Sequence, residues 1–522
     1  MIRNRRVLTV AAAGCCAALL LAACSSENDT GGAAGGAQSS GKPVQGGTLR
    51  AIEISEPRNL DPALLQNSLQ GTAFLGNALY GNLMVTQEKT GALEYRMATD
   101  FSSADGGGTY TLTLKAGLTF SDGSALDAAA VKYNWDRLRD AKLGSDSLPY
   151  ASVVKSTTVV DATTLKVTLT RPTALYGEQV AGTAMNWIAS PAALKKGESS
   201  FDKAPIGAGP FTLKTWTRGG AISLVKNTTY YDAPKPYLDG ITLTTSADPQ
   251  QRVNTLSSGG ADLGVEVDWK AVAKAKAAGL TAESVPSGGG RFLTLNASQA
   301  PFDNLKARQA VSEAIDVDAL NAAVYDGKAV VADNLFPKES PYYNDVALHT
   351  YDKAGAQKLF DELAAEGKPV SFTFTAFPTD KALAEAVQSQ LSAYKNVTVE
   401  IDTVDWSESG KVYGQKQYDM LTSTAFFLDP EPALSSAFSS KSPRNATLLA
   451  DDQLDAALAK GASAPSDTER AAAYKTVSER LAALDPAVFI ARTSQTALSK
   501  GVGGVVLDGS GSPLPAELWL DK

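Results

Sequence analysis

The chain has 522 residues, of which 44% are hydrophobic and 20% are charged, and its 48 lysines and arginines against 56 acidic residues give a formal net charge of −8. An acidic balance of this kind argues against a protein that binds nucleic acid. A chain of this length exceeds what one hydrophobic core usually supports, so the sequence predicts two or more lobes.

The first 23 residues have the pattern of a secretory signal peptide. Arg3, Arg5 and Arg6 precede an uncharged apolar stretch, Val7 to Ala23, that is closed by small residues. A transmembrane anchor is the alternative, but the apolar run is at the short limit for a span and no stop-transfer charges follow it. The "RRVLT" stretch leaves both Sec and twin-arginine export open. In either case we expect an exported protein.

The next four letters, "LAAC" (Leu21 to Cys24), resemble a bacterial lipobox. In such a motif the cysteine is diacylated and becomes the first residue of the mature protein, so Cys24 is the expected lipidation site. Two acyl chains suffice for stable anchoring, which predicts a protein tethered to the outer face of a bacterial cell membrane. Residues 24–46 are rich in Gly, Ala and Ser, which predicts a flexible linker after the lipidated cysteine.

Cleavage before Cys24 would change the charge and the cysteine content. It would remove three arginines and no acid, leaving 45 basic against 56 acidic residues and a net charge of −11. It would also remove Cys15 and Cys16, and lipidation would occupy Cys24. The folded part would then have neither a thiol nor a disulfide, and its stability must come from core packing.

Several segments of the mature chain alternate apolar and polar residues with period two. Thr109–Lys115, Thr163–Thr170 and Phe372–Phe377 show this pattern, which is typical of half-buried strands. The segments "FTLKTW" and "AISLVK" flank Thr217–Gly220, whose two glycines predict a hairpin turn.

Helical patterns lie between these strands. Ser124 is followed by Asp127 three residues later, which predicts a helix beginning with a capping box at Ser124. The apolar residues Val131, Trp135 and Leu138 then recur at helical spacing.

A second helix is predicted between two strands. It follows Phe372–Phe377 and precedes Val397–Val404, and Leu383, Val387, Leu391 and Tyr394 line one of its faces. A strand, a helix and a strand in this order predict a parallel pair and an alpha/beta layer. We find no internal repeat and no second linker, so the lobes are expected to be interleaved by chain crossings.

The sequence shows no catalytic or cofactor motif. His349 is the only histidine. This excludes metal sites with several histidine ligands and any Ser-His-Asp or Cys-His catalytic site built on another histidine. There is no G-x-S-x-G, no Walker loop and no dinucleotide fingerprint. We therefore expect no enzyme, no metal and no cofactor, and we expect His349 to be a surface residue.

Five motifs in order resemble one protein family. They are "GGTLRAIEISEPRNLDPA", "LKAGLTFSDGSALDAAAVKYNW", "APIGAGPFTLKTW" with "VKNTTYYDAPKPYLDGI", "LNASQAPFDNLKARQAVSEAIDVDAL", and "YDKAGAQKLFDEL". The chain resembles the extracytoplasmic solute-binding proteins of the peptide, opine and nickel class (solute-binding protein family 5), which serve ABC importers. The resemblance covers residues 46–500, and one departure is Ala130, where the family usually has Asp.

The resemblance implies an alpha/beta, periplasmic-binding-protein-like two-lobe fold of type II, cluster C, with an extra third domain. Lobe I would comprise residues 47–78, 205–295 and 491–522, the extra domain residues 79–204, and lobe III residues 296–490. The solute would be enclosed as the lobes rotate about the crossings between them.

The expected pocket differs from that of peptide-binding relatives at one position. Trp406 matches a tryptophan that walls their side-chain pockets. In "TSTAFFLDPEPA" the gapless alignment puts Leu428 where relatives have the aspartate that holds the peptide amine, and Asp429 is one residue late. A one-residue shift would let Asp429 pair with a ligand amine. Without the shift, which we favour, Asp429 begins an Asp-Pro turn and its side chain caps the backbone.

Other expected contacts follow from the same resemblance. Phe426, Phe427 and Leu428 predict a drier pocket wall or, equally well, ordinary core. Gln66 and Ser68 follow "LDP" where relatives contact ligand, and Tyr150 matches a pocket tyrosine. The candidate ligand-binding residues are Trp406, Phe426, Phe427, Leu428, Asp429, Tyr150, Gln66 and Ser68.

The function that the resemblance implies is capture of a small organic solute, a peptide or peptide-like compound, and its delivery to an ABC permease with its ATPase subunits. A monomer is expected, with the lipid anchor as its membrane contact. A nickel chelate or another non-peptide solute is the alternative ligand; direct nickel coordination is not expected from one histidine and no free thiol. A sensor lipoprotein without a transport role is the alternative function, and a hydrolase is disfavoured by the missing catalytic groups.

Overall fold

The computed structural model describes residues 41–88, 91–464 and 466–521. The predicted signal peptide, Cys24 and most of the predicted linker lie outside the described residues. Within the described ranges, no helix is long and apolar enough to cross a membrane.

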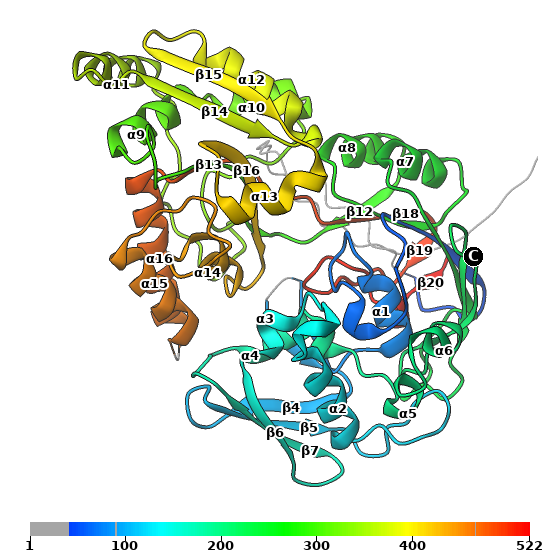
Figure 1. Cartoon of the computed structure of the whole chain (residues 1–522). Helices are drawn as coiled ribbons and strands as arrows, with labels where there is room; N and C mark the ends of the chain where they lie inside the picture. Colours follow the sequence, from blue (N-terminus) through cyan, green and yellow to red (C-terminus); the bar gives the residue numbers. More distant parts are fainter. Residues whose placement is uncertain (1–40, 89–90, 465, 522) are drawn as a thin grey trace, which may run out of the picture. The chain divides into compact units, whose positions relative to one another are not determined.

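A seven-stranded sheet brings together β1, near the start of the described chain, and β18, near its end (Figure 1). Its order is β12-β18-β11-β1-β10-β9-β8, and β1 pairs in parallel with both β10 and β11. The β8–β9 hairpin confirms the predicted turn, because Thr217 N–H donates to Ala221 O at 3.1 Å and Gly219 has a φ of +69°. The strands are β1 (Thr48–Glu53), β8 (Phe211–Trp216), β9 (Ile222–Lys226), β10 (Gly240–Thr245), β11 (Leu263–Glu266), β12 (Thr281–Ser284) and β18 (Thr496–Ser499).

A five-stranded sheet of order β15-β14-β16-β13-β17 forms a second layer. The predicted strand, helix and strand unit is confirmed: β14 and β15 pair in parallel, and α12 between them buries Leu383, Val387 and Leu391. The elements are β13 (Gly288–Leu295), β14 (Val370–Ala376), α12 (Lys381–Leu391), β15 (Val397–Thr403), β16 (Met420–Phe427) and β17 (Ala487–Ala491). Further helices are α9 (Leu305–Ala314), α10 (Val317–Tyr325), α11 (Lys353–Ala365), α13 (Ser409–Gln415), α14 (Ala433–Phe438), α15 (Asp452–Ser463) and α16 (Asp467–Leu484).

A four-stranded antiparallel sheet of order β4-β5-β7-β6 packs against α2. The predicted helix start is corrected: α2 begins after Asp127, which accepts from Ala130 N–H at 2.9 Å, because Phe120 N–H donates to Ser124 O and keeps Ser124 in a turn. Trp135 is fully buried and its Nε1 donates to Met185 O at 2.8 Å. The elements are β4 (Ala98–Ser103), β5 (Thr109–Leu114), α2 (Ala128–Leu138), β6 (Val154–Val159) and β7 (Thr164–Leu169).

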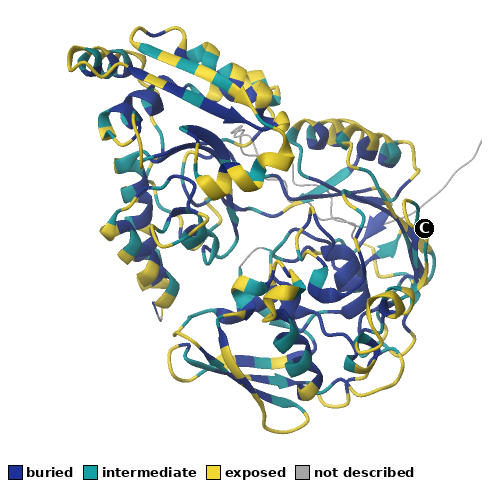
Figure 2. Ribbon diagram, viewed as in Figure 1, coloured by how far each residue is buried: buried dark blue, intermediate teal, exposed yellow. Residues whose placement is uncertain are grey.

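Shorter elements connect these layers. The helix α1 (Ala73–Tyr80) is buried along its whole length (Figure 2), and Asn77 on it accepts from Trp187 Nε1 at 2.9 Å and donates to Asp508 Oδ2 at 3.0 Å. These bonds tie the loop at Asp508 to the core. The remaining elements are β2 (Met84–Thr86), β3 (Leu93–Tyr95), α3 (Leu148–Ala151), α4 (Tyr176–Ala181), α5 (Pro191–Leu194), α6 (Glu198–Lys203), α7 (Pro249–Ser257), α8 (Trp269–Ala277), β19 (Val502–Gly503) and β20 (Trp519–Leu520).

Two crossings between the large sheets run side by side. Residues 285–287 lead from β12 to β13, residues 492–495 lead from β17 to β18, and Val285 N–H donates to Gln495 O at 3.2 Å. The predicted limit of lobe I at residue 295 does not coincide with the sheets, because β13 pairs with β16 and β17. A Cβ at Gly289 would lie 2.1 Å from Ala425 O, and φ there is +70°. Only glycine at this position lets β13 approach β16 so closely. The other predicted domain limits stay predictions.

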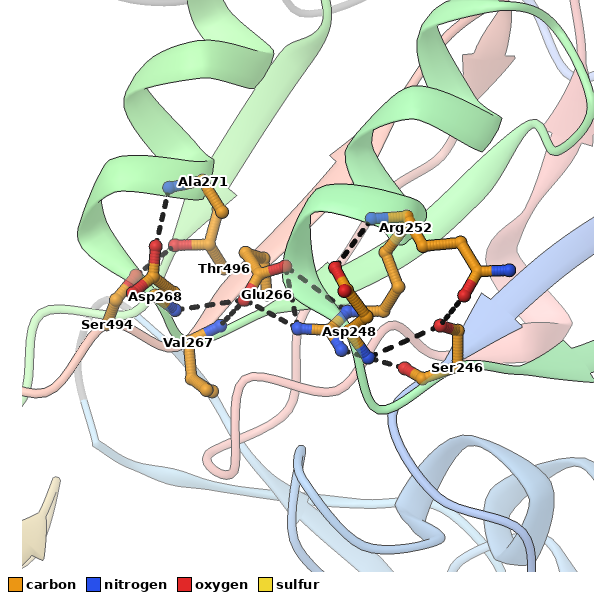
Figure 3. A network of polar contacts seen from close by, with 10 residues as sticks. Ser246, Asp248, Arg252, Glu266, Val267, Asp268, Ala271, Ser494 and Thr496 are labelled. Carbon is orange, nitrogen blue, oxygen red and sulfur yellow. Dashed lines mark hydrogen bonds and ion pairs between the residues drawn. The ribbon is translucent and has the colours of Figure 1, made fainter. Parts of the chain in front are cut away.

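A buried ion pair joins α7 to the end of β11 (Figure 3). Arg252 Nη2 lies 2.7 Å from both carboxylate oxygens of Glu266, and the two side chains are 3% and 0% exposed. Glu266 Oε1 also accepts from the backbone N–H groups of Val267 (2.9 Å) and Asp268 (3.0 Å), while Arg252 Nη1 donates to Ser246 O (2.8 Å). The pair therefore joins the segment after β10 to the end of β11, and β11 pairs with β18, where the second crossing enters the sheet.

Glu53, at the end of β1, makes the stability of this region depend on pH. The residue is 5% exposed, and burial raises the pKa of its carboxyl from 4.5 to about 8, against the opposing charge of Arg252. The folded chain therefore holds a proton that the unfolded chain has lost. Its stabilising effect is full below about pH 4.5 and disappears as the pH rises through about 8. Relative to the Glu53→Gln variant, the free energy of unfolding of the unchanged protein should fall by up to about 1.4 kcal/mol per pH unit between about pH 5 and 8.

Urea unfolding at each pH unit measures this difference. The matched control is Glu385→Gln, whose side chain is 58% exposed on α12 and should leave the pH dependence unchanged. If the free energy of unfolding has the same pH dependence in Glu53→Gln as in the unchanged protein, the pH dependence does not come from Glu53.

Candidate functional site

A cavity of about 340 Å³, named cavity A, lies where distant segments of the chain meet. Its volume is within the range of small-molecule pockets. Ser68, Tyr150 and Glu178 line it from the first half of the chain. The remaining walls are formed by residues 424–433 after and within β16, by Thr493 and Gln495 of the second crossing, and by residues 508–510.

The three apolar residues at the end of β16 have different surroundings. Phe427 is 3% exposed and packs edge to face on Phe336, with ring centroids 5.6 Å apart, so it belongs largely to the core. Phe426 is half-buried and Leu428 packs against the cluster of Val285, Ala497 and Leu507. All three of the predicted residues contribute to the wall of cavity A. The structure thus contains both alternatives of the sequence analysis, core for Phe427 and pocket wall for Phe426.

Asp429 has the geometry of a turn residue. Its Oδ1 accepts from Glu431 N–H at 3.0 Å. Arg470 Nη2 lies 3.0 Å from Oδ1 and 2.7 Å from Oδ2, and the side chains of Arg470 and Asp429 are 4% and 15% exposed. Burial raises the pKa of the Asp429 carboxyl, and Arg470 opposes this. Both carboxylate oxygens therefore already have partners within the protein.

Arg470 itself was not singled out by the sequence. It lies on α16, 41 residues beyond Asp429, and no local pattern links the two. Its Nη1 also donates to the hydroxyl of Tyr342, and its guanidinium lies 4.8 Å from the centroid of that ring.

Two further carboxyl groups on the wall of cavity A were also missed. Burial, together with the charge of Asp429, raises the pKa of Glu178 to about 7 and that of Glu431 to about 8. Asp508 is buried as well, but it accepts hydrogen bonds from Asn77, Ser510 and Ser512. Cavity A is therefore acidic, with titrating groups near neutral pH.

Of the remaining predicted ligand-binding residues, two lie on the wall of cavity A and two do not. Ser68 and Tyr150 lie on the wall of cavity A. Gln66 is exposed and its Nε2 donates to Asp146 Oδ2 at 2.8 Å. Trp406 is 51% exposed and stacks on Phe377 with ring centroids 4.2 Å apart. Gln66 and Trp406 thus lie outside cavity A as the structure has it.

A second cavity of about 610 Å³, named cavity B, shares Tyr150, Gln179, Glu431 and Pro432 with cavity A. Its character is different, because basic side chains and serine hydroxyls line it. These are Arg171, Lys441, Arg444, Ser435, Ser436, Ser439, Ser442 and Ser463. Cavity A thus has acidic groups and no lysine or arginine on its lining, whereas cavity B has three basic side chains beside the acids Glu431 and Asp455.

The described residues contain no group of three or more His, Cys, Asp and Glu side chains that could hold a metal ion. His349 is half-buried rather than a surface residue, which corrects the expectation. Its Nε2 lies 2.8 Å from Ile315 O and its Nδ1 3.3 Å from Ser312 Oγ, and burial lowers its pKa. The ring is held because Nε2 donates to the carbonyl and Nδ1 accepts from the hydroxyl.

Comparison with known proteins adds sequence relatives. The family model described as bacterial extracellular solute-binding proteins, family 5 middle, matches residues 92–445. The chain is similar to the glutathione-binding protein GsiB of Salmonella paratyphi A, with 34% identity over 282 residues. That match covers 53% of this chain and 54% of the relative, so the chain spans about half the length of that relative.

Two solved structures show the likeness of the fold. NikA from Brucella suis, in complex with Fe(III)-EDTA, has a TM-score of 0.78 and 24% identity, with 91% of this chain and 100% of NikA covered. DppA from Helicobacter pylori, in complex with the peptide STSA, has a TM-score of 0.75 and 23% identity, with 92% and 99% covered. At these identities the comparison supports the fold and not the ligand.

Proposed function

The chain belongs to family 5 of the bacterial extracellular solute-binding proteins, and from this premise we propose that it captures a short peptide or peptide-like solute for an ABC importer. The observation that carries the proposal is cavity A, whose wall combines residues 424–433, the crossing residues Thr493 and Gln495, and residues from the first half of the chain. A solute bound there would contact both sides of the crossings, so its binding would favour one arrangement of the lobes.

The ligand class is supported by two arguments. The relative GsiB is named a glutathione-binding protein, and glutathione is a short peptide-like compound. Basic side chains line cavity B but not cavity A, and the two cavities share part of their lining, which suits a solute that carries both an amine and an acid. A chelate of the kind bound to NikA is the second candidate.

The cellular setting is part of the proposal. We propose that the first 23 residues are a signal peptide, that Cys24 is lipidated, and that the protein acts as a monomer on the outer face of the cell membrane. Its partners would be two permease subunits and their ATPases. The family consists of solute-binding proteins, and we propose no catalytic activity. Genes for permeases and ATPases beside this one would support import, and their absence would favour a sensor.

Calorimetry of a soluble form that begins after Cys24 tests the ligand class. We expect one-to-one binding of glutathione or of at least one peptide of two to four residues, and no sub-micromolar binding of nickel salts or nickel chelates. Ser68→Trp should place an indole in cavity A and weaken peptide binding by about tenfold or more, about 1.4 kcal/mol, with an unchanged melting temperature because Ser68 is exposed. Binding of chelates but of no peptide would overturn the peptide assignment.

A further inference from the structure

Three buried oxygen atoms on the wall of cavity A have no hydrogen-bond partner. Over the described residues, five buried side-chain polar atoms are without one, and three of the five belong to residues that line this cavity. The three atoms are Asn67 Oδ1, Glu178 Oε2 and Glu431 Oε1. Unpartnered buried polar atoms are uncommon in native proteins. Their concentration around one cavity marks the part of the wall where a bound polar group would find free hydrogen-bonding atoms.

When the two carboxyl groups are ionised, all three atoms are acceptors. Asn67 Nδ2 donates to Ala181 O and Thr183 O, both at 3.1 Å, and this fixes its amide oxygen as the group left free. The other two are carboxyl oxygens of Glu178 on α4 and of Glu431 in the segment between β16 and α14. A group that satisfies several acceptors at once must have several donors. Primary ammonium and guanidinium groups have them, and both are positively charged.

The charges around cavity A lead to the same type of ligand. Arg470, whose charge acts on both Glu178 and Glu431, is already paired with Asp429. The groups that act on Glu178 are Asp429, Asp467 and Arg470, and those that act on Glu431 are Asp429 and Arg470, besides its hydrogen bonds to Ser435. Of these acting charges, Asp429 and Asp467 are acids and only Arg470 is a base, and it is already paired. The bases Arg171, Lys441 and Arg444 line cavity B, which Glu431 also lines. A cation entering cavity A would replace the protons of the two glutamates.

We propose that cavity A binds the positively charged group of the solute, a primary amine or a guanidinium, through Asn67, Glu178 and Glu431. The inference rests on the proposed function and specifies its substrate class. It assigns the amine contact to residues other than Asp429, whose oxygens are bonded to Arg470 and to Glu431 N–H. Because the acceptors come from the segment at Asn67, from α4 and from the segment after β16, the bound cation would also join these parts of the chain.

Calorimetry with charge-matched probes tests the proposal. The probes are trialanine, trialanine amide, N-acetyl-trialanine, putrescine and agmatine. We expect the two free-amine peptides to bind, and acetylation of the amine to weaken binding by about a hundredfold. Glu178→Gln and Glu431→Gln should each weaken binding of the free-amine peptides by about tenfold or more. Glu339→Gln, which removes an exposed charge from a neighbouring cavity, should have no effect.

Two further readouts separate a ligand contact from a structural role. The glutamine variants should leave the melting temperature unchanged, because one carboxyl oxygen of each glutamate lacks a partner in the free protein and an amide can keep the bonds of the other. The unchanged protein should release protons on binding at pH 7, seen as a dependence of the binding enthalpy on the buffer, and each variant should release fewer.

The outcomes distinguish the inference from the proposed function. Equal affinity for acetylated and free-amine peptides would overturn the inference and leave a peptide receptor. Binding of putrescine or agmatine, weakened by Glu431→Gln, with no binding of peptides, would support the inference and overturn the peptide function. Absence of binding by every probe would overturn both.

Discussion

Arg252→Met is expected to lower the free energy of unfolding by about 3 to 5 kcal/mol, because it leaves the carboxylate of Glu266 buried without its counter-charge. Glu266 is 0% exposed, and without Arg252 it would keep only the N–H groups of Val267 and Asp268 as donors. Methionine replaces the apolar stem of Arg252 and lacks its guanidinium, so most of the loss reports the missing charge and its hydrogen bonds. Urea unfolding of the soluble form at pH 7 measures it.

A matched substitution on the surface separates burial from charge. Lys381→Met removes the cation of an exposed ion pair with Glu385, whose side chains are 63% and 58% exposed, and should cost less than about 1 kcal/mol. The double variant Arg252→Met with Glu266→Gln should recover part of the stability, because a buried pair replaced on both sides leaves no isolated charge. A loss for Arg252→Met no larger than that for Lys381→Met would show that the pair contributes little.

The fold could be predicted well from the sequence where the pattern is local or the family motifs are specific. The alternation in Phe372–Phe377, the helix after it and the parallel strand at Val397 are found as β14, α12 and β15. The predicted two-lobe fold of solute-binding proteins is confirmed by the family model and the solved structures. The predicted start of α2 was wrong because Ser124 and Asp127 are both good capping residues. The hydrogen bond from Phe120 N–H to Ser124 O holds Ser124 in a turn before the helix, and Asp127 caps the helix instead.

Long-range contacts set the features that the sequence did not reveal. Gly288–Gly290 carry no periodic signal, yet they place β13 against β16 and β17, far along the chain. The partner of Asp429 is 41 residues away, on α16. The acceptors at Asn67, Glu178 and Glu431 are recognised by the partners they lack, which is a property of the folded cavity alone. Leu428, which the gapless alignment predicts to face the ligand, lies on the wall of cavity A, and its contact with a ligand stays a prediction.

Asp429→Asn is expected to act as a change of structure and not as the loss of a ligand contact. The substitution leaves Arg470, whose side chain is 4% exposed, without its carboxylate, and should lower the free energy of unfolding by about 3 to 5 kcal/mol. The same loss should follow from Arg470→Met, which leaves Asp429 unpaired. If Asp429 and Arg470 stabilise the fold as a pair, the double variant Asp429→Asn with Arg470→Met should lose less free energy of unfolding than the two single variants lose together.

Binding separates this structural role from direct recognition of an amine. Because the pair holds the segment that carries Leu428 and Glu431, Asp429→Asn should weaken binding of trialanine and of N-acetyl-trialanine by similar factors, measured by calorimetry on the folded fraction. Glu431→Gln, by contrast, should discriminate between the two peptides and leave the melting temperature unchanged. If Asp429 is paired with Arg470, its substitution must lower the stability. An Asp429→Asn variant that keeps its melting temperature and loses only the free-amine ligands would therefore show that Asp429 contacts the ligand amine.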